Sequence, residues 1–305
     1  MSHRTKENSV VQEKWLVAPG QTKVIDFELV RKLKLGLIGG KVDLIGHDEP
    51  GARVEVHSVS GKELKIWMDG DTLEIDHPQL RWDNFIEVFA SFRGTAKADL
   101  SIMVPRDVAL KFGVVFADAL ISGLRSDAKL STVSGDIVVD DVTGDLELNG
   151  VNGEMSVRNH VGAINAHTVS GEFTASGDIR SFSLDGVASN IFLDVAGTPD
   201  LITTNTVSGN LTVRLGAEVP VRYRLNTLTG TLQLDDKTIR GSFGKGYEGS
   251  VGKLDGAWLD LSVSSVSGDI SVVRRASEST EPDGTGSSEA KPSDASADSA
   301  AEASS

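Results

Sequence analysis

The chain has 305 residues, with 30 Lys plus Arg against 44 Asp plus Glu and no cysteine. Its apolar share of 39% and its 32 glycines are ordinary for a globular protein, which excludes a collagen, a coiled coil and a disulfide scaffold. Without cysteine there is no thiolate nucleophile, iron–sulfur cluster or cysteine zinc site, and the redox compartment stays open. The net charge of −14 argues against a nucleic-acid partner, because an acidic surface repels phosphate.

The N-terminal segment 1–9 is polar, and we expect it to be disordered. The first apolar stretch after it is interrupted by charged residues and a proline, unlike the apolar region of a signal peptide. No window reaches the 18 consecutive apolar residues of a membrane span. We therefore expect a cytoplasmic protein without a direct membrane span, held at the inner face of the envelope only through a partner.

Residues 10–104 are expected to form a β-rich cap that leads into the rest of the fold. Alternating or apolar runs between turn residues predict strands at Lys23–Leu29, Lys32–Leu44, Arg53–Val59, Leu64–Ile75 and Ala98–Val104. The segment Asp83–Phe92 fits a helix and a strand equally well. Large aromatic residues gather in this part and indicate closure of an open strand edge: Trp15, Phe27, Trp67, Trp82, Phe85, Phe89 and Phe92.

A nine-residue repeat follows. Glycines recur every nine residues from Gly135 to Gly171, and apolar residues stand two and four positions after each glycine. Nine residues accommodate a short strand and a tight corner but not a helix and its return. Each corner is expected to need positive φ or close backbone approach. The structural glycines of the repeat are Gly135, Gly144, Gly153, Gly162, Gly171, Gly209, Gly230 and Gly268.

A second repeat, Thr-Val-Ser-Gly or a close variant, sets the length of a turn. Its hydroxyl residues before glycine are Ser134, Ser170, Ser208, Thr229 and Ser267. Consecutive members are 36, 38, 21 and 38 residues apart. If these distances in sequence span two, two, one and two turns of a winding chain, each turn has about 18–21 residues. The sequence thus predicts an all-β fold, a parallel β-solenoid over residues 105–275, in which the Thr229 turn directly follows the Ser208 turn.

Side chains at equivalent positions of such a solenoid form rows along its axis. Three rows, of threonine, serine and acidic or amide residues, are candidates: Thr132, Thr168 and Thr206; Ser134, Ser170 and Ser208; Asp136, Glu172 and Asn210. Thr and Ser also favour strands and satisfy backbone groups at corners. The rows are therefore either purely structural or a repetitive recognition surface.

Catalytic and metal-binding patterns are thin. There is no G-x-S-x-G motif, and the repeated serines are structural equivalents rather than one activated nucleophile. The six histidines lack metal-ligand spacing, and His160 and His167 are expected at the surface or in turns. We expect no catalytic residue, cofactor or metal. The glycine-rich segment Gly241–Gly252 is interpreted as a mobile insertion where a partner can dock.

The last thirty residues, 276–305, contain seven acidic residues and one lysine, and so carry −6 of the −14 charge. Apolar residues give way here to Ser, Ala, Glu, Asp, Gly and Pro. Such a composition cannot bury a core. We expect a disordered acidic tail.

The repeated [ST]-[VL]-[ST]-G, the strand Asp99–Pro105 and the terminal Ser-Val-Ser-Gly-Asp-Ile-Ser-Val resemble the bacterial "putative adhesin" or toastrack family. The resemblance covers roughly Trp15–Arg275. It implies a parallel β-solenoid of uncharacterised function and, through relatives beside membrane-stress sensors, an envelope-stress context.

Three hypotheses of function follow. The first is a non-enzymatic scaffold or protein-interaction module that binds a protein partner or associates with itself. The second is an exported adhesin or glycan-binding surface protein, and the third, less favoured, is a carbohydrate-active enzyme.

Overall fold

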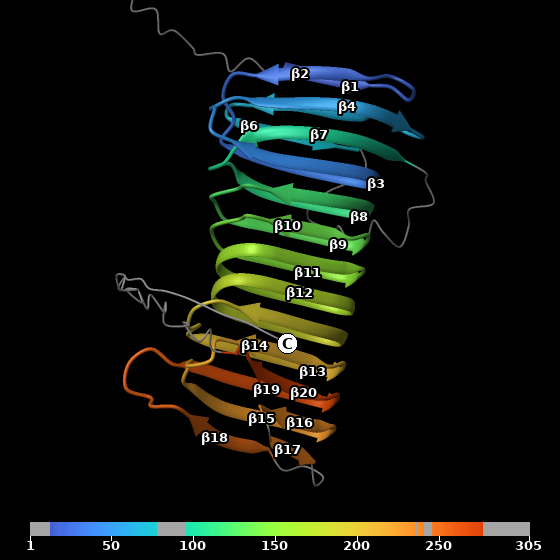
Figure 1. Cartoon of the computed structure of the whole chain (residues 1–305). Helices are drawn as coiled ribbons and strands as arrows, with labels where there is room; N and C mark the ends of the chain where they lie inside the picture. The colour runs from blue at the N-terminus through green and yellow to red at the C-terminus, as the bar shows by residue number, and fades with distance from the viewer. Residues whose placement is uncertain (1–12, 78–95, 236, 241–245, 277–305) are drawn as a thin grey trace, which may run out of the picture.

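The computed structural model describes residues 13–77, 96–235, 237–240 and 246–276. All regular elements in these ranges are strands that join one 20-stranded sheet, so the prediction of an all-β fold is confirmed. Figure 1 shows the strands stacked along one long axis. Among the described residues no helix is long and apolar enough to cross a membrane. The segments 1–9, 83–92 and 277–305 lie outside the description.

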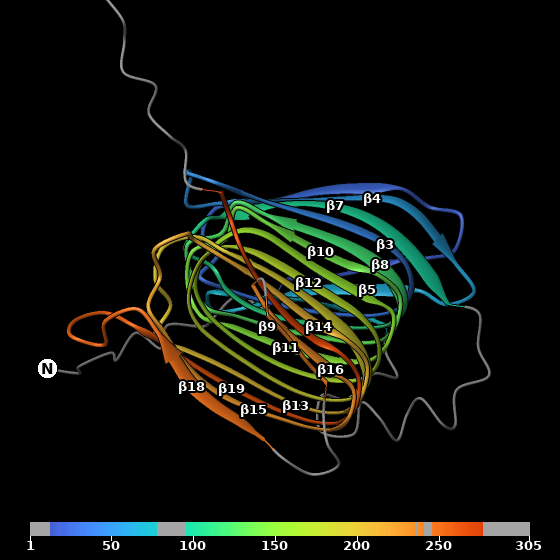
Figure 2. The same cartoon turned by 60° about the horizontal axis from the view of Figure 1, so that its bottom comes forward.

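The chain winds so that each strand pairs in parallel with the strand one turn later. Leu110 pairs with Ala128, Ala128 with Leu146, and Ile137 with Met155, a shift of 18 residues each time. Figure 2 shows the winding end-on. The strands involved are β8 (Ala109–Ser122), β9 (Ala128–Ser134), β10 (Ile137–Asp140), β11 (Leu146–Asn152) and β12 (Glu154–Val195).

Each turn contributes one strand to each of two sheet faces. The first face contains β9, β11 and the parts of β12 around Ile164 and Phe182; the second contains β10 and the parts around Met155 and Ile191. We call the bend from the first to the second face the first corner, and the return bend the second corner. Alternation within each strand directs every second side chain inward.

The turn of β13 (Leu201–Ser208) and β14 (Leu211–Leu215) is longer. Phe182 pairs with Ile202 and Ile191 with Leu211, a shift of 20 residues. Across the first corner, Phe182 and Ile191 are nine residues apart, as in the regular turns. Across the second corner, Ile191 and Ile202 are eleven residues apart, whereas Ile137 and Leu146 of a regular turn are nine apart. The two added residues therefore lie in the second corner.

The order of the last turns differs from the prediction. β19 (Leu259–Ser267) and β20 (Ile270–Arg274) insert between β13–β14 on one side and β15 (Val221–Thr229) and β16 (Thr231–Leu234) on the other. The Ser208 turn is thus followed in space by the Ser267 turn. The prediction was wrong because the chain folds back: β17 (Lys237–Arg240) and β18 (Tyr247–Val251) run antiparallel along the outer edges of β16 and β15.

This fold-back also corrects the interpretation of Gly241–Gly252. Residues 241–245 lie outside the description, but Tyr247–Val251 forms the strand β18, not a mobile insertion. Together, β17 and β18 cover edges that would otherwise expose unpaired backbone groups.

The N-terminal end is covered in a similar way. β3 (Lys32–His47) is itself a turn and pairs with β8 in parallel. On each face one further strand pairs with β3 in parallel, and antiparallel strands extend the sheet beyond it. Trp15 and Phe27 are in edge-to-face contact at 5.3 Å between ring centroids. The first face gains β6 (Thr72–Asp76), β5 (Leu64–Asp69) and β1 (Glu13–Val17), and the second gains β7 (Lys97–Pro105), β4 (Ala52–Ser60) and β2 (Lys23–Phe27).

The core runs along the inside of the winding. Leu33 and Leu35 in β3 are buried between exposed or half-buried lysines, as their alternation predicts. The largest purely hydrocarbon side chains that are fully buried are those of Phe112, Phe173 and Phe182. Burial of each such side chain contributes about 1.5–3 kcal/mol, which holds successive turns together.

Candidate recognition surface

The first corner is built on close backbone stacking. Gly135 has φ +133°, and a Cβ atom there would lie 2.3 Å from the carbonyl oxygen of Ala117 in the preceding turn. Gly230 lacks positive φ, yet its Cβ would lie 2.1 Å from the oxygen of Gly268. Among the glycines of the repeat, Gly144 and Gly162 lie at the second corner, and the first corner holds Gly135, Gly153, Gly171, Gly209, Gly230 and Gly268.

The predicted threonine row lies on the inside of the first corner. Thr132 and Thr168 are buried and Thr206 is half-buried. They are not direct neighbours, since Gly150 pairs with both Thr132 and Thr168 and Gly186 with Thr206. The Thr132 hydroxyl donates to the carbonyl oxygen of Gly135 at 3.5 Å. Thr132 therefore satisfies a backbone group, and the burial of Thr132 and Thr168 keeps these two side chains from a ligand.

The serine row lies at the bend. Ser134, Ser170 and Ser208 are half-buried, and the Ser208 hydroxyl donates to the Val187 carbonyl oxygen one turn away at 3.4 Å.

The acidic and amide row begins the second face and ties successive turns together. Asp136, Glu172 and Asn210 are exposed. The Glu154 N–H donates to the Asp136 carboxylate at 3.0 Å, and the Asp269 N–H donates to the Asn210 side-chain oxygen at 3.0 Å. These contacts give the row a structural role, and the bond at Asn210 fixes the inserted turn in place.

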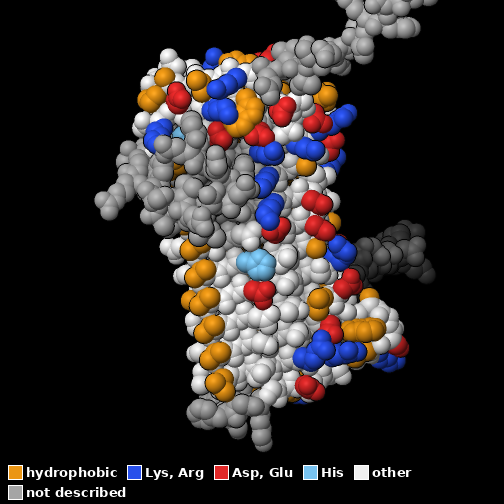
Figure 3. All heavy atoms as spheres, turned by 180° about the vertical axis from the view of Figure 1, so that it is seen from behind, with side chains coloured by type: hydrophobic (Ala, Val, Ile, Leu, Met, Phe, Trp, Pro, Cys, Tyr) orange, Lys and Arg blue, Asp and Glu red, His pale blue; other side chains and the backbone are white. Residues whose placement is uncertain are grey.

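A fourth row, between the threonines and the serines, forms an aliphatic stripe on the outside. The residues that flank Val187, Val207, Val266 and Leu228 pair from one turn to the next, and each member is about half exposed. A Cβ at Gly186 would lie 3.5 Å from Thr168, which places Val169 one turn before Val187. At about 4.8 Å per turn the row is about 19 Å long. It appears along the left edge of Figure 3. The aliphatic stripe consists of Val169 (48% exposed), Val187 (47%), Val207 (50%), Val266 (48%) and Leu228 (48%).

The bend explains why these side chains face outward. In β9 the inward residues are even-numbered, such as Leu130 and Thr132, whereas in β10 they are odd-numbered, such as Ile137. The corner changes the parity, so the residue after each inward residue of the threonine row points outward. This row was not predicted, although an aliphatic residue between two hydroxyl residues at Val169, Val207, Leu228 and Val266 was a signal of it. Val187, between Gly186 and Ala188, lacks that signal.

The row changes character towards the N-terminus. The equivalent residues Ile38, Val115 and Val133 are only 2%, 2% and 4% exposed, and Val151 is half-buried. Other atoms of this chain therefore cover the N-terminal continuation and leave the aliphatic stripe uncovered.

A polar trough runs along the first face beside the row. One cavity of about 570 Å³ is lined by Asn149, His167 and Asp185 among others, and an adjoining one of about 660 Å³ shares Lys129 and Glu147 with it. The Glu147 carboxylate accepts hydrogen bonds from Lys129 and Asn149, and the bond from Lys129 lowers its pKa. The His167 Nδ1 lies 3.6 Å from Asp185. Apolar side chains also line both cavities, among them Val169 in the first and Ile164 and Phe182 in the second, beside the hydrogen-bonding groups.

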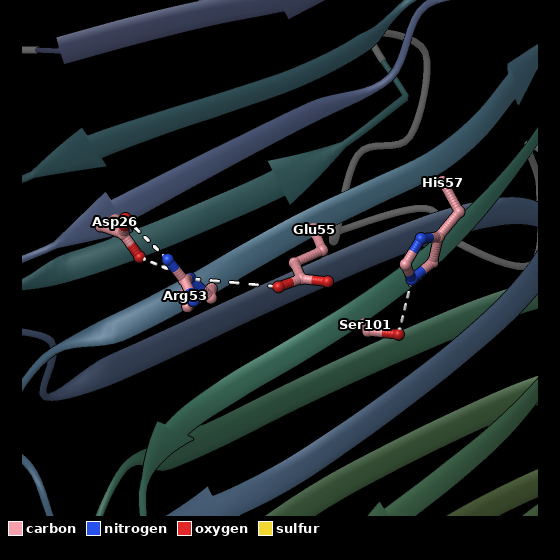
Figure 4. Close-up of polar contacts among 5 residues, drawn as sticks. All are labelled: Asp26, Arg53, Glu55, His57 and Ser101. Atoms are coloured by element: carbon pink, nitrogen blue, oxygen red, sulfur yellow. Dashed lines mark hydrogen bonds and ion pairs between the residues drawn. The ribbon is translucent and has the colours of Figure 1, made fainter.

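A polar cluster on the N-terminal part of the second face is shown in Figure 4. His57 Nε2 and Ser101 Oγ share a hydrogen bond of 2.7 Å between β4 and β7. Asp99 in β7 accepts a hydrogen bond from Ser58. The Ser–His pair is exposed, and among the described residues no hydrogen bond joins His57 to a carboxylate of the kind that orients the base beside an activated nucleophile.

Arg53 completes this cluster by joining strands. Its guanidinium binds Asp26 at 2.8 Å and lies 4.0 Å from Glu55. All three groups are exposed, and exposed ion pairs contribute little to stability.

His160 lies in the second corner and is fully buried, not at the surface. Burial is the main cause that lowers its pKa. His167 is exposed, as predicted. Among the described residues no three acidic, histidine or cysteine side chains could hold a metal ion together.

No model of a known protein family matches the sequence, and no curated protein matches it. A solved structure of a putative cell adhesion protein from Clostridium sporogenes is similar over 86% of this chain and 100% of that one, with 14% identity and a TM-score of 0.30. A putative adhesin from Bacteroides fragilis covers 83% and 98%, with 10% identity and a TM-score of 0.41. A putative lipid binding protein from Parabacteroides distasonis covers 84% and 98%, with 10% identity and a TM-score of 0.37. These similarities are too weak to carry an argument about function.

Proposed function

We propose that this protein is a non-enzymatic β-solenoid, with a cap over residues 10–104 and repeats over 105–275, that binds a protein partner through the aliphatic stripe. The observation that supports it is the unbroken row of five half-exposed aliphatic side chains. Other exposed aliphatic residues among the described ones form no row of this length: Leu16 and Val161 stand alone, and Ile45 pairs only with Met103. Contiguous apolar surface of this kind marks interaction sites.

The fold does not need the aliphatic stripe to be apolar. Its side chains lie half in water, and polar β-formers such as threonine would suit the same backbone. Burial against a partner removes this apolar area from water at about 25 cal/mol per Å². Binding of a partner therefore explains in terms of free energy why these positions are apolar, which folding alone does not.

A pull-down from native cells tests the proposal. Wild-type protein is expected to recover a protein that Val207→Glu loses. Val161→Glu is the matched control, because Val161 has the same side chain and similar exposure, 46%, but lies at the second corner. Equal recovery by all three proteins would contradict the proposal, provided that circular dichroism shows all three folded.

A second candidate is glycan binding, the exported-adhesin alternative, which the polar trough favours. Amide, hydroxyl and charged groups along the first face suit sugar hydroxyls. A glycan array with wild-type protein and Asn149→Ala tests it. Binding that the variant loses would support the alternative, and an array without signal would remove it.

The proposed location is the cytoplasm, with a possible envelope-stress role at the inner face of the envelope through the partner. Cell fractionation tests this directly. Recovery of native protein at the cell surface or in the medium would overturn it and favour the exported adhesin.

A further inference from the structure

We propose that the aliphatic stripe binds a second copy of this chain, as a side-by-side dimer in which the two stripes run antiparallel about a two-fold axis at Val207. This inference rests on the proposed function and names the partner. Three properties of the aliphatic stripe carry it: its repeat distance, the charge beside it, and the extent of its exposed side chains.

The repeat distance selects a partner with the same repeat. Side chains of the aliphatic stripe stand about 4.8 Å apart because each comes from a successive turn. Along an α-helix, side chains on one face recur with a 5.4 Å pitch, and along a strand every second side chain recurs at about 6.6–6.8 Å. A second solenoid of the same kind stays in step over all five positions, so β-branched side chains such as Val187 and Val266 can pack opposite one another.

The charge pattern permits two copies of an acidic protein to approach here. The serine side of the aliphatic stripe is uncharged at each of its five turns: Ser170, Ala188, Ser208, Ser267 and Thr229. On the other side the first face presents His167, Asp185, Asn205, Ser264 and Asn226, of which Asp185 faces His167 and Asn205. Figure 3 shows the area beside the row as mostly uncharged, with charged side chains gathered at the lower right. The acidic side chains near the aliphatic stripe are therefore few, Asp185 on the first face and Glu172 and Asp269 two residues beyond the serine side, although the net charge is −14.

The extent of the exposed row sets the position of the axis. Ile38, Val115 and Val133 are only 2%, 2% and 4% exposed, so the row offers exposed side chains from Val169 to Leu228, with Val207 at its centre. An antiparallel dimer about this centre places the buried end of each row beyond the last turn of the other copy. The row then faces its partner with Val207 opposite Val207 and Val169 opposite Leu228.

Light scattering across a concentration series is the first test. The wild-type mass is expected to rise from 32.3 kDa towards twice that value with concentration. Val207→Glu is expected to weaken the dimer by about 30-fold or more, because it buries an unpaired charge at the centre of the contact. Val161→Glu is expected to leave the dimer unchanged. Val187→Thr keeps the shape of the side chain and adds no charge, so it is expected to weaken the dimer less than Val207→Glu. This variant takes the place of Val207→Glu if the glutamate prevents folding.

Cysteine cross-linking is the second test. Because the chain has no cysteine of its own, only the introduced residues can form a disulfide. Under mild oxidation Val207→Cys is expected to form a covalent dimer rapidly, because only residues near the axis meet their own copy. Val169→Cys alone is expected to stay uncross-linked, whereas Val169→Cys with Leu228→Cys is expected to cross-link. Rapid dimerisation of Val169→Cys alone would overturn the antiparallel arrangement.

The outcomes separate this inference from the proposed function. A wild-type protein that stays monomeric at its highest soluble concentration overturns the dimer. If Val207→Glu nevertheless loses a foreign protein in the pull-down, the aliphatic stripe is a recognition surface for another partner and the proposed function stands. If the protein is monomeric and the pull-down is unchanged, both fail.

Discussion

The two corners of the winding have the same 18-residue period but are built differently. At the first corner glycines stack on the backbone of the preceding turn, and the outward residue is aliphatic five times in succession. At the second corner the residues vary from turn to turn and include the buried His160, and the added residues of the longer turns lie here. The regular corner is the one that can present a repeated surface.

Close stacking is common to both corners, and side-chain contacts distinguish them. A Cβ at Gly171 would lie 2.0 Å from the oxygen of Gly153 at the first corner, and a Cβ at Gly162 would lie 2.1 Å from the oxygen of Gly144 at the second. The second corner is held in addition by particular side chains, such as Arg180 on Asp145 and Arg274 on the carbonyl oxygens of Ala217 and Val219. Long side chains tolerate loops of different length. The four predictions below test this contrast.

The largest effect is expected at the first corner. Gly171→Ala forces a Cβ against a backbone oxygen at φ +130° and is expected to destabilise the protein by at least about 3 kcal/mol. Gly70→Ala is the control, because Gly70 also has positive φ, +64°, but open space around it. It is expected to cost only about 1–2 kcal/mol. Urea unfolding measures both, and equal losses would refute close stacking as the cause.

At the second corner Arg274→Met is expected to cost about 2–3 kcal/mol. The guanidinium donates to Val219 O at 2.7 Å and to Ala217 O at 3.1 Å, and its side chain is 16% exposed. Arg224→Met removes an exposed ion pair with Asp260 and is expected to cost less than about 1 kcal/mol. A midpoint of urea unfolding that is the same in both variants would show that Arg274 does not hold this corner.

The acidic and amide row is expected to contribute less per residue. Asp136→Ala removes the acceptor for the Glu154 N–H and is expected to cost about 1 kcal/mol. Asp136→Asn keeps an acceptor and is expected to be nearly neutral. Thermal unfolding compares the two, and a loss of equal size in both would mean that charge, not the hydrogen bond, matters at this position.

The smallest effect at neutral pH is expected for His160→Leu, and it grows in acid. Burial lowers the pKa of His160 in the folded state below its ordinary value of about 6.5, although hydrogen bonds with the backbone of Val142 and Ala163, and to a lesser extent Asp145, oppose part of this. Below about pH 6.5 the unfolded chain therefore binds more protons, and the free energy of unfolding falls as pH falls. The stability advantage of His160→Leu over wild type is expected to increase from pH 7 to pH 5 in urea unfolding. An advantage that is constant with pH would contradict this.

Much of the architecture could be predicted from the sequence because the period of the repeat is a local signal. Glycine every nine residues and alternation after each glycine predict strands, corners and inward side chains such as Ile137 and Leu146 without knowledge of the fold. The row containing Asp136 and Asn210 was likewise visible. The exposure of Val207 was not predicted, because strand alternation does not show the change of parity at a bend.

What the sequence determined by itself is the repeat: strand length, corner positions and the all-β class, all of which depend on residues close together in the chain. The tertiary structure alone decided the order of the last turns and the side on which each row lies. The Ser267 turn sits beside the Ser208 turn through a shift of 59 residues, which no local period encodes. Parallel pairing is nearly the same between any two equivalent turns, so the fold-back through β17 and β18 and the contact of Asp269 with Asn210 select the neighbour.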